Sequence, residues 1–212
     1  MASRRSEIGG RPGKTVRAAP LTTSVGLGSP GGAVQARVRE DGLVSVDMGT
    51  PNFAPRSLPM DFPQEQLTYA LKANGAELEV GAVSMGNPHI VLRVADTARA
   101  AVESLGPQLE HDSHFPNRTN VGFMQIVNRD HIVLRVFERG AGETLACGTG
   151  ACAAMVIGRR WGLLETDVRV DLPGGTAWVS WAGFDQHVWL TGPATTVFKG
   201  SIDLSSFMGV QQ

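Results

Sequence analysis

The stretch from Phe137 to Met155 holds the residues most able to carry out chemistry, because a glycine-rich loop there surrounds Cys147. Small apolar residues with no polar face follow from Ala151 to Gly158, and this pattern predicts a helix buried on all sides. The free N–H groups and positive dipole at the start of such a helix favour a thiolate, and they form an anion pocket at Gly148 to Gly150. With the carboxylate of Glu138 nearby, these groups predict proton transfer on a substrate that carries a carboxylate.

Three motifs of this chain closely resemble the diaminopimelate epimerase family. The longest runs from Glu138 to Ala154, as Glu-Arg-Gly-Ala-Gly-Glu-Thr-x-Ala-Cys-Gly-Thr-Gly-Ala-Cys-Ala-Ala, and the others are Met85 to His89 and Asn120 to Met124. The resemblance extends from about Gly32 to Leu204. It implies interconversion of LL- and meso-diaminopimelate without a cofactor. Two opposed thiols would move the proton, because one base cannot easily reach both faces of an α-carbon.

The resemblance also implies a set of site residues. The expected catalytic residues are Cys147, Glu138 and His89, and the expected substrate-binding residues are Asn87, Asn120, Glu138, Arg139, Gly148 and Thr149. In this assignment Cys147 is an acid or base, Glu138 tunes its protonation, and His89 partners the cysteine of the other half-site. Arg139 is expected to make a two-pronged contact with a substrate carboxylate, and the two asparagines hold the distal end of the substrate.

Each of these side chains also has a structural interpretation. Cys147 fits a small buried apolar residue, the asparagines fit turns, and His89 fits a hydrogen-bonded strand histidine. Glu138 and Arg139 fit charged residues at a strand end, and Cys152, within the apolar run, is expected to be structural. The sequence shows no metal-ligand spacing, nucleotide-binding glycine fingerprint or lysine-centred pyridoxal site, so we expect neither a metal nor a cofactor.

Alternating apolar patterns and turn residues predict many short strands around the buried helix. A hairpin is predicted over residues 33–48, with its turn at Asp41-Gly42. Further strands are predicted at 67–71, 76–85, 89–94, 121–127, 131–137, 167–172, 176–181, 187–191 and 195–198. A surface helix is predicted from Asp96 to Leu105, stopped by Gly106-Pro107. The expected fold class is α+β, a diaminopimelate-epimerase-like β-barrel or rolled antiparallel sheet around a central buried helix.

The chain divides into four predicted parts. Residues 1–31 are basic and contain scattered Gly, Ser and Pro, so we expect a disordered or replaced leader, with an organellar transit peptide as the alternative. The resemblance implies that residues 32–50 are a hairpin remnant of the family's first domain and that residues 51–195 form the C-terminal epimerase-like domain. Residues 196–212 are then a tail strand that returns to the first domain.

The family's first domain carries its own Cys-Gly-Asn-Gly motif and the second catalytic cysteine, and neither precedes Cys147 here. We therefore expect only the Cys147 half-site, and an isolated chain that is weak or inactive. The expected protein partner is a complementing first-domain fragment or a second copy in a homodimer. Two other functions stay open, namely a non-catalytic amino-acid-binding module derived from the epimerase and a related proline-racemase-like isomerase. The two asparagine motifs and the Glu138 run argue against the racemase.

Composition narrows the partners. The net charge of −1 gives no electrostatic case for nucleic acid or an anionic membrane, and no apolar run approaches the roughly 18 residues that span a bilayer. The sequence holds 2 cysteines, too few for a disulfide scaffold. We therefore expect a cytoplasmic protein that acts on a small molecule and binds neither nucleic acid nor membrane.

Overall fold

The computed structural model describes residues 24–29 and 32–201. Its helices are α1 (Val102–Glu110) and α2 (Gly148–Arg160), with short 3-10 helices η1 (Pro55–Ser57) and η2 (Thr97–Arg99). Its strands are β1 (Ser24–Ser29), β2 (Gly32–Val38), β3 (Val44–Asp47), β4 (Tyr69–Ala73), β5 (Ala76–Ser84), β6 (Pro88–Arg93), β7 (Asn120–Asn128), β8 (His131–Glu138), β9 (Gly142–Thr144), β10 (Asp167–Leu172), β11 (Gly175–Trp181) and β12 (Val188–Gly192).

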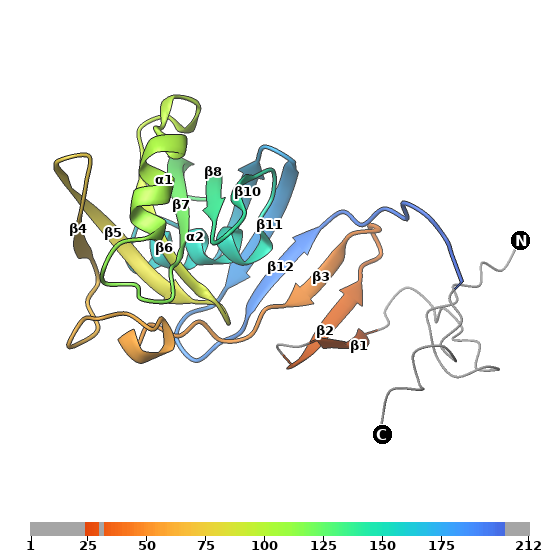
Figure 1. Cartoon of the computed structure of the whole chain (residues 1–212). Helices are drawn as coiled ribbons and strands as arrows, with labels where there is room; N and C mark the ends of the chain where they lie inside the picture. Colours follow the sequence, from red (N-terminus) through yellow and green to blue (C-terminus); the bar gives the residue numbers. More distant parts are fainter. Residues whose placement is uncertain (1–23, 30–31, 202–212) are drawn as a thin grey trace, which may run out of the picture.

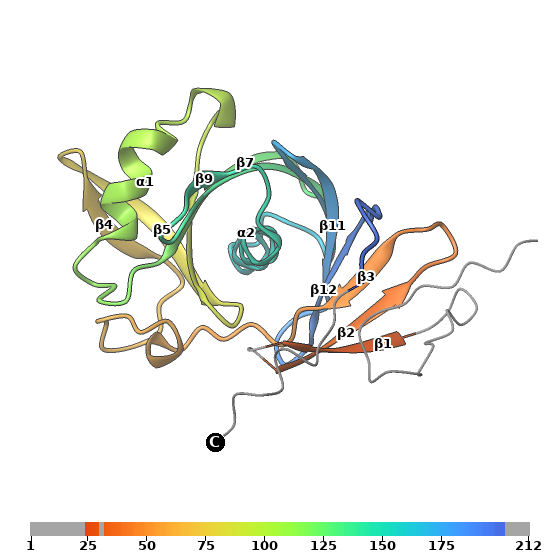
Figure 2. The same ribbon diagram turned by 45° about the vertical axis from the view of Figure 1, so that its right-hand side comes forward.

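The strands form one 12-stranded sheet in the order β1-β2-β3-β12-β11-β10-β8-β7-β6-β5-β4, and β9 pairs with β8. This sheet curls around α2, which is seen nearly end-on in Figure 2. The predicted α+β class and the rolled sheet around a central helix are confirmed. The sheet is not wholly antiparallel, however, because β6 pairs with β7 and β8 with β10 in parallel. A parallel pair needs a long crossover, and α1 and α2 lie in these two crossovers.

Helix α2 is enclosed by the curled sheet, as its apolar sequence predicts. Its small side chains, including Ala151, Ala153 and Ala154, are fully buried. They allow strands to approach the helix from several directions, and Gly81 of β5 does the same from the sheet side. A Cβ atom at Gly81 would lie 2.4 Å from the side chain of Ile157 in α2. The position of α2 is therefore fixed by close packing on most of its circumference.

Helix α1 covers the outer face of the same strands (Figure 1). Along β6, Ile90 and Leu92 belong to the apolar cluster under α1, whereas Val91 belongs to the cluster around α2. Both faces of these central strands are therefore buried, and this explains why their sequences are continuously apolar.

The predicted hairpin is confirmed. β2 and β3 pair with Ala36 opposite Val46, and Gly42 in the turn has a φ of +83°. β3 also pairs with β12, so the hairpin continues the main sheet and extends away from its curled part (Figure 1). Within the expected leader over residues 1–31, Ser24–Ser29 form β1, which pairs with β2 and continues the sheet by one strand. The rest of the leader, residues 1–23 and 30–31, lies outside the described residues.

Two other predicted elements differ from the structure. The helix expected at 96–105 is instead η2, capped by the Asp96 carboxylate, followed by α1, which runs through Gly106 and Pro107. Tertiary packing overrides the local stop signal, because the missing side chain of Gly106 lets α1 approach β8. In the expected tail, residues 196–201 are not a strand and no described strand pairs with them; residues 202–212 lie outside the described residues. No helix within the described ranges is both long and apolar enough to cross a membrane.

Candidate active site

Cys147 immediately precedes the first turn of α2. Its backbone is extended, with φ −134° and ψ 108°, and the helix begins at Gly148. Gly150 in the first turn leaves room for the thiol, since a Cβ atom there would lie 3.2 Å from Cys147 Sγ. The N–H groups of this first turn have no acceptor within the helix, and that of Gly150 lies close enough to the thiol to lower its pKa.

The thiol of Cys147 is hydrogen-bonded to a carboxylate. Cys147 Sγ donates to Glu138 Oε2 at 3.0 Å, and Thr144 Oγ1 donates to Glu138 Oε1 at 2.6 Å. Glu138 is the last residue of β8 and Thr144 the last of β9, so the pairing of these two strands fixes the carboxylate. The hydroxyl of Thr149 lies 3.6 Å from Sγ on the helix side. Glu138 is thus placed to accept the proton of the Cys147 thiol.

The structure corrects the expectation of a thiolate at Cys147. Burial of the side chain and its hydrogen bond to the Glu138 carboxylate raise the pKa of the Cys147 thiol to about 11. The Thr149 hydroxyl and the Gly150 N–H lower this pKa, but by less. The dipole argument fails here because a neighbouring anion and a nearly closed environment outweigh the helix terminus. Cys147 is therefore a neutral acid at physiological pH.

We expect the rate of alkylation by iodoacetamide to increase with pH, with a midpoint near pH 11, because only the thiolate of Cys147 reacts. Cys152 should contribute little, since it is fully buried in α2 and burial raises the pKa of its thiol further. The measurement is the alkylation rate as a function of pH, from about pH 6 to about pH 12. Cys147→Ala is the control that should abolish the signal, and a midpoint at the ordinary thiol value of about 8.5 would contradict the prediction.

His89 and Asn87 connect the sheet to the same helix. His89 Nε2 lies 3.0 Å from Asn87 Oδ1, and Asn87 Nδ2 donates to Thr149 Oγ1 at 3.4 Å. His89 is almost fully buried, and this burial, aided by the charge of Arg139, lowers the pKa of its imidazole to about 3. A neutral ring satisfies Asn87 when its Nε2 carries the proton. In this geometry His89 orients Asn87 and is not charged near neutral pH.

Asn120 holds the strand ends together. Its Nδ2 donates to the carbonyl of Pro88 at 2.8 Å, and its Oδ1 accepts the backbone N–H of Arg139 at 2.9 Å. The side chain is buried, and these bonds use one amide hydrogen and the amide oxygen. The guanidinium of Arg139 is exposed and donates to the carbonyl of Asn117 at 3.2 Å. The structure therefore gives Asn120 a role in holding the backbone at Arg139.

The predicted site residues are brought together by the fold. One chain of contacts links His89, Asn87, Thr149, Cys147 and Glu138, and strand pairing sets His89 beside Asn120. Sequence reasoning missed the part played by Thr144, although it lies inside the longest motif. In the described part of the chain, no group of His, Cys, Asp or Glu side chains is arranged to hold a metal.

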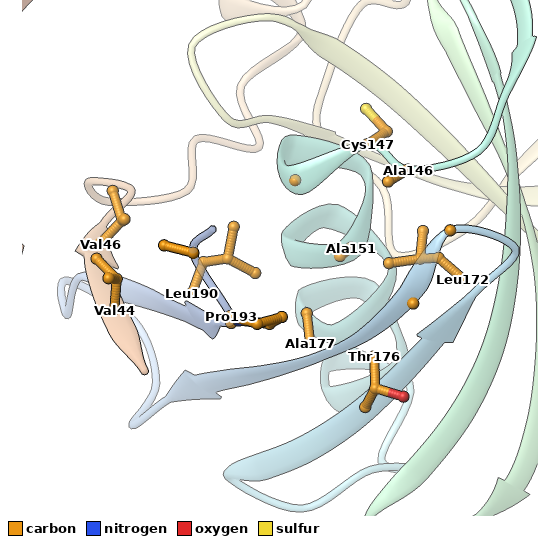
Figure 3. Close-up of a pocket in the computed structure, with 15 residues that line it drawn as sticks. Val44, Val46, Ala146, Cys147, Ala151, Leu172, Thr176, Ala177, Leu190 and Pro193 are labelled. Carbon is orange, nitrogen blue, oxygen red and sulfur yellow. The ribbon is translucent and has the colours of Figure 1, made fainter. Parts of the chain in front are cut away.

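A cavity of about 400 Å³ opens beside Cys147. Val44 and Val46 of β3 lie on one side and Ala151 of α2 on the other, with Leu190 of β12 between them (Figure 3). Of the predicted site residues, only Cys147 and Gly148 line this cavity. Its wall is largely apolar, so the cavity offers few polar partners for an amino acid.

In this fold a curled sheet encloses a buried helix, and Cys147 of this chain lies directly before the N-terminus of that helix. Solved structures with this fold include a probable proline racemase from Agrobacterium radiobacter K84, with a TM-score of 0.63 over 91% of this chain and 64% of that one. A hydroxyproline epimerase from Agrobacterium vitis has a TM-score of 0.59 over 84% of this chain and 58% of its own. Both are 16% identical to this chain, so the likeness shows the fold.

The chain belongs to the diaminopimelate epimerase family, whose sequence profile matches residues 81–197. It is 57% identical over 173 residues to the diaminopimelate epimerase of Alkalilimnicola ehrlichii, covering 82% of this chain and 62% of the relative. The enzyme of Azotobacter vinelandii is 53% identical, with 82% and 63% covered, and that of Pseudomonas aeruginosa is 50% identical, with 85% and 66% covered. The chain thus spans a little under two thirds of the length of these relatives.

Proposed function

We propose that this chain carries the Cys147 half of a cofactor-independent diaminopimelate epimerase. The observation that supports this most directly is the hydrogen bond of 3.0 Å from the Cys147 thiol to Glu138 at the N-terminus of the buried helix α2. A neutral thiol with a proton acceptor behind it can serve as the acid in one direction of the reaction and as the base in the other.

The proton inventory follows from this pair. In one direction the thiol gives its proton to the α-carbanion, whose electron pair forms the new C–H bond, and the resulting Cys147 thiolate takes a proton from the carboxyl group of Glu138. In the other direction the thiol passes its proton to the Glu138 carboxylate, and the thiolate removes the α-proton while the electrons of that C–H bond stay on carbon. Inversion needs a second acid–base group on the opposite face, which performs the complementary transfer.

The start of α2 is the proposed site for the substrate carboxylate. The N–H groups of Gly148 and Thr149 belong to the first turn, where the positive end of the helix dipole favours an anion. Negative charge that develops on the carboxylate during carbanion formation would be stabilised there. We propose that Arg139 and Asn87 contribute to substrate binding, whereas Asn120 acts by holding the backbone of Arg139.

The proposed partner is a first-domain fragment that supplies the second thiol. The chain spans 62% of the Alkalilimnicola ehrlichii relative, and the largely apolar cavity beside Cys147 lacks the polar groups that a second α-amino acid end would need. A covering polypeptide would supply these groups and exclude water from the thiol. A homodimer is the alternative partner. We also propose a cytoplasmic setting, in line with two free cysteines in the described chain.

Proton NMR of the full chain with LL-diaminopimelate in deuterated buffer tests the proposed function. We expect deuterium uptake at the α-carbon with retained configuration, because one thiol exchanges the proton from one face only. Cys147→Ala should abolish the uptake. Formation of the meso isomer by the chain alone would contradict the half-site, since some other group would then replace the second thiol. Binding without any uptake would instead indicate the non-catalytic module.

Addition of the first domain of the Alkalilimnicola ehrlichii relative completes the test. We expect the mixture to form the meso isomer when neither component does so alone, and the activity should depend on Cys147. A mixture in which the chain with Cys147→Ala is equally active would show that this chain contributes no catalytic group.

A further inference from the structure

Glu110, the last residue of α1, is a buried carboxylate outside the proposed catalytic pair. Its side chain is 5% exposed. A carboxylate at a helix C-terminus is unfavourable, because the dipole there is negative, and a buried charge is costly unless it is well hydrogen-bonded. The position therefore needs an explanation that local helix preference does not supply.

The contacts of Glu110 lead to the loop after β8. Its Oε1 accepts the backbone N–H of Gly140 at 2.8 Å. Two exposed side chains lie farther from the carboxylate. Arg118 Nη1 is 3.7 Å from Oε1, and His111 Nδ1 is 3.5 Å from Oε2. The short bond is thus the one to Gly140, and the charge is only loosely balanced by Arg118.

Gly140 belongs to the turn that presents Glu138. The backbone N–H of Ala141 donates to the carbonyl of Glu138 at 3.1 Å, and Gly140 has a φ of +76°. The preceding N–H, that of Arg139, is held by Asn120. Two consecutive N–H groups of the turn are therefore fixed by buried side chains, one from α1 and one from β7. A turn held at two points keeps the carboxylate of Glu138 within reach of Cys147.

We propose that Glu110 is a positioning residue that fixes the turn after β8 and thereby holds the Glu138 carboxylate on the Cys147 thiol. This inference rests on the proposed function for its relevance to catalysis, but the geometry that it explains does not. The acceptor oxygen at the right distance from Gly140 is the property that matters. The charge of Glu110 is secondary.

Two conservative variants separate the effect of the acceptor oxygen's distance from Gly140 from the effect of the negative charge of Glu110. Glu110→Gln keeps an acceptor oxygen at the same distance from Gly140 and removes the charge. Glu110→Asp keeps the charge and withdraws the carboxylate by one methylene group, about 1.5 Å. Neither creates a large cavity, and circular dichroism with thermal unfolding reports whether each variant is folded.

The readout is the pH profile of Cys147 alkylation by iodoacetamide in the full chain. When Glu138 moves away from the thiol, the pKa of Cys147 loses one of its raising influences and the midpoint falls. Each unit of decrease should raise the rate at pH 8 about threefold, because the thiolate fraction rises tenfold while nucleophilicity falls with the pKa. We expect this increase in Glu110→Asp, and a wild-type profile in Glu110→Gln.

Three results would overturn the proposal. The first is a wild-type profile in Glu110→Asp, even if its thermal stability is lower, because a merely structural residue changes stability without moving the thiol midpoint. The second is an equal shift in both variants, which would make the charge and not the reach responsible. The third is a shift in Glu110→Gln alone. Because alkylation needs no substrate, none of these outcomes depends on whether the chain is an epimerase.

Discussion

Glu138→Gln is expected to make Cys147 more reactive toward iodoacetamide and at the same time to slow the proposed exchange of the α-proton of diaminopimelate. The glutamine has nearly the same shape and removes the negative charge. The hydrogen bond to the carboxylate and its charge both raise the pKa of the Cys147 thiol, so this pKa should fall. Burial, the largest cause of the increase, remains, and the midpoint should stay above that of a free thiol.

Exchange should decrease because an amide cannot take the thiol proton. A positioned acid or base contributes about 10² to 10⁴ in rate, so we expect deuterium uptake to fall at least about a hundredfold. The two measurements are the alkylation profile and the uptake rate by NMR, on the same preparations. Loss of the proton acceptor should speed alkylation and slow deuterium uptake. A general disturbance of the site would slow deuterium uptake without lowering the pH midpoint of alkylation.

Glu143→Gln is the matched control. Glu143 lies on β9 and is paired with Arg135 at 2.6 Å, with no hydrogen bond to Cys147. The variant makes the same carboxylate-to-amide change a few residues from Glu138. The alkylation profile of Cys147 and the rate of deuterium uptake should both stay at wild-type values. If exchange survives in Glu138→Gln, the proton of the thiol leaves by another route. If the alkylation profile does not move, Glu138 does not hold the thiol.

The site could be predicted from sequence to the extent that it is local. Cys147 stands directly before an apolar helix and Glu138 ends a strand, and their short separation along the chain already brings thiol and carboxylate together. The protonation state could not be predicted, because it depends on how completely the fold excludes water from Cys147. The same holds for His89, whose neutral ring follows from burial between the sheet and α2.

Residues that act across the fold gave no signal. Glu110 meets Gly140 only because α1 lies over β7 and β8, and a pattern along the chain contains no information on that contact. The curled sheet was predictable from short alternating strands around one apolar run. Its parallel strand pairs were not, because they depend on the direction in which the crossovers through α1 and α2 bring the chain back to the sheet. The stop predicted at Gly106-Pro107 failed for a related reason, because packing on β8 stabilises the continued helix.

That packing makes Gly106→Ala the most disruptive single-methyl change expected in this part of the fold. A Cβ atom at Gly106 would lie 2.5 Å from Cγ and 2.9 Å from Cβ of Phe137. Cβ is attached to the backbone and cannot swing away, so α1 and β8 must separate. An exposed helical glycine gains about 1 kcal/mol when replaced with alanine, whereas overpacking costs about 1–3 kcal/mol. With contacts this short the overpacking term should dominate.

We expect Gly106→Ala to lower the free energy of unfolding by about 2 kcal/mol, measured by urea denaturation with an unchanged m-value. Ser104→Ala, at an exposed position of the same helix, is the control and should stay within about 0.5 kcal/mol of the wild type. The variant should also lower the pH midpoint of Cys147 alkylation, because Phe137 precedes Glu138 and α1 carries Glu110. Separation of α1 from β8 then loosens the carboxylate from two directions. A stabilised Gly106→Ala with an unshifted alkylation profile would mean that the contact between α1 and β8 sets neither the stability of the fold nor the protonation of its thiol.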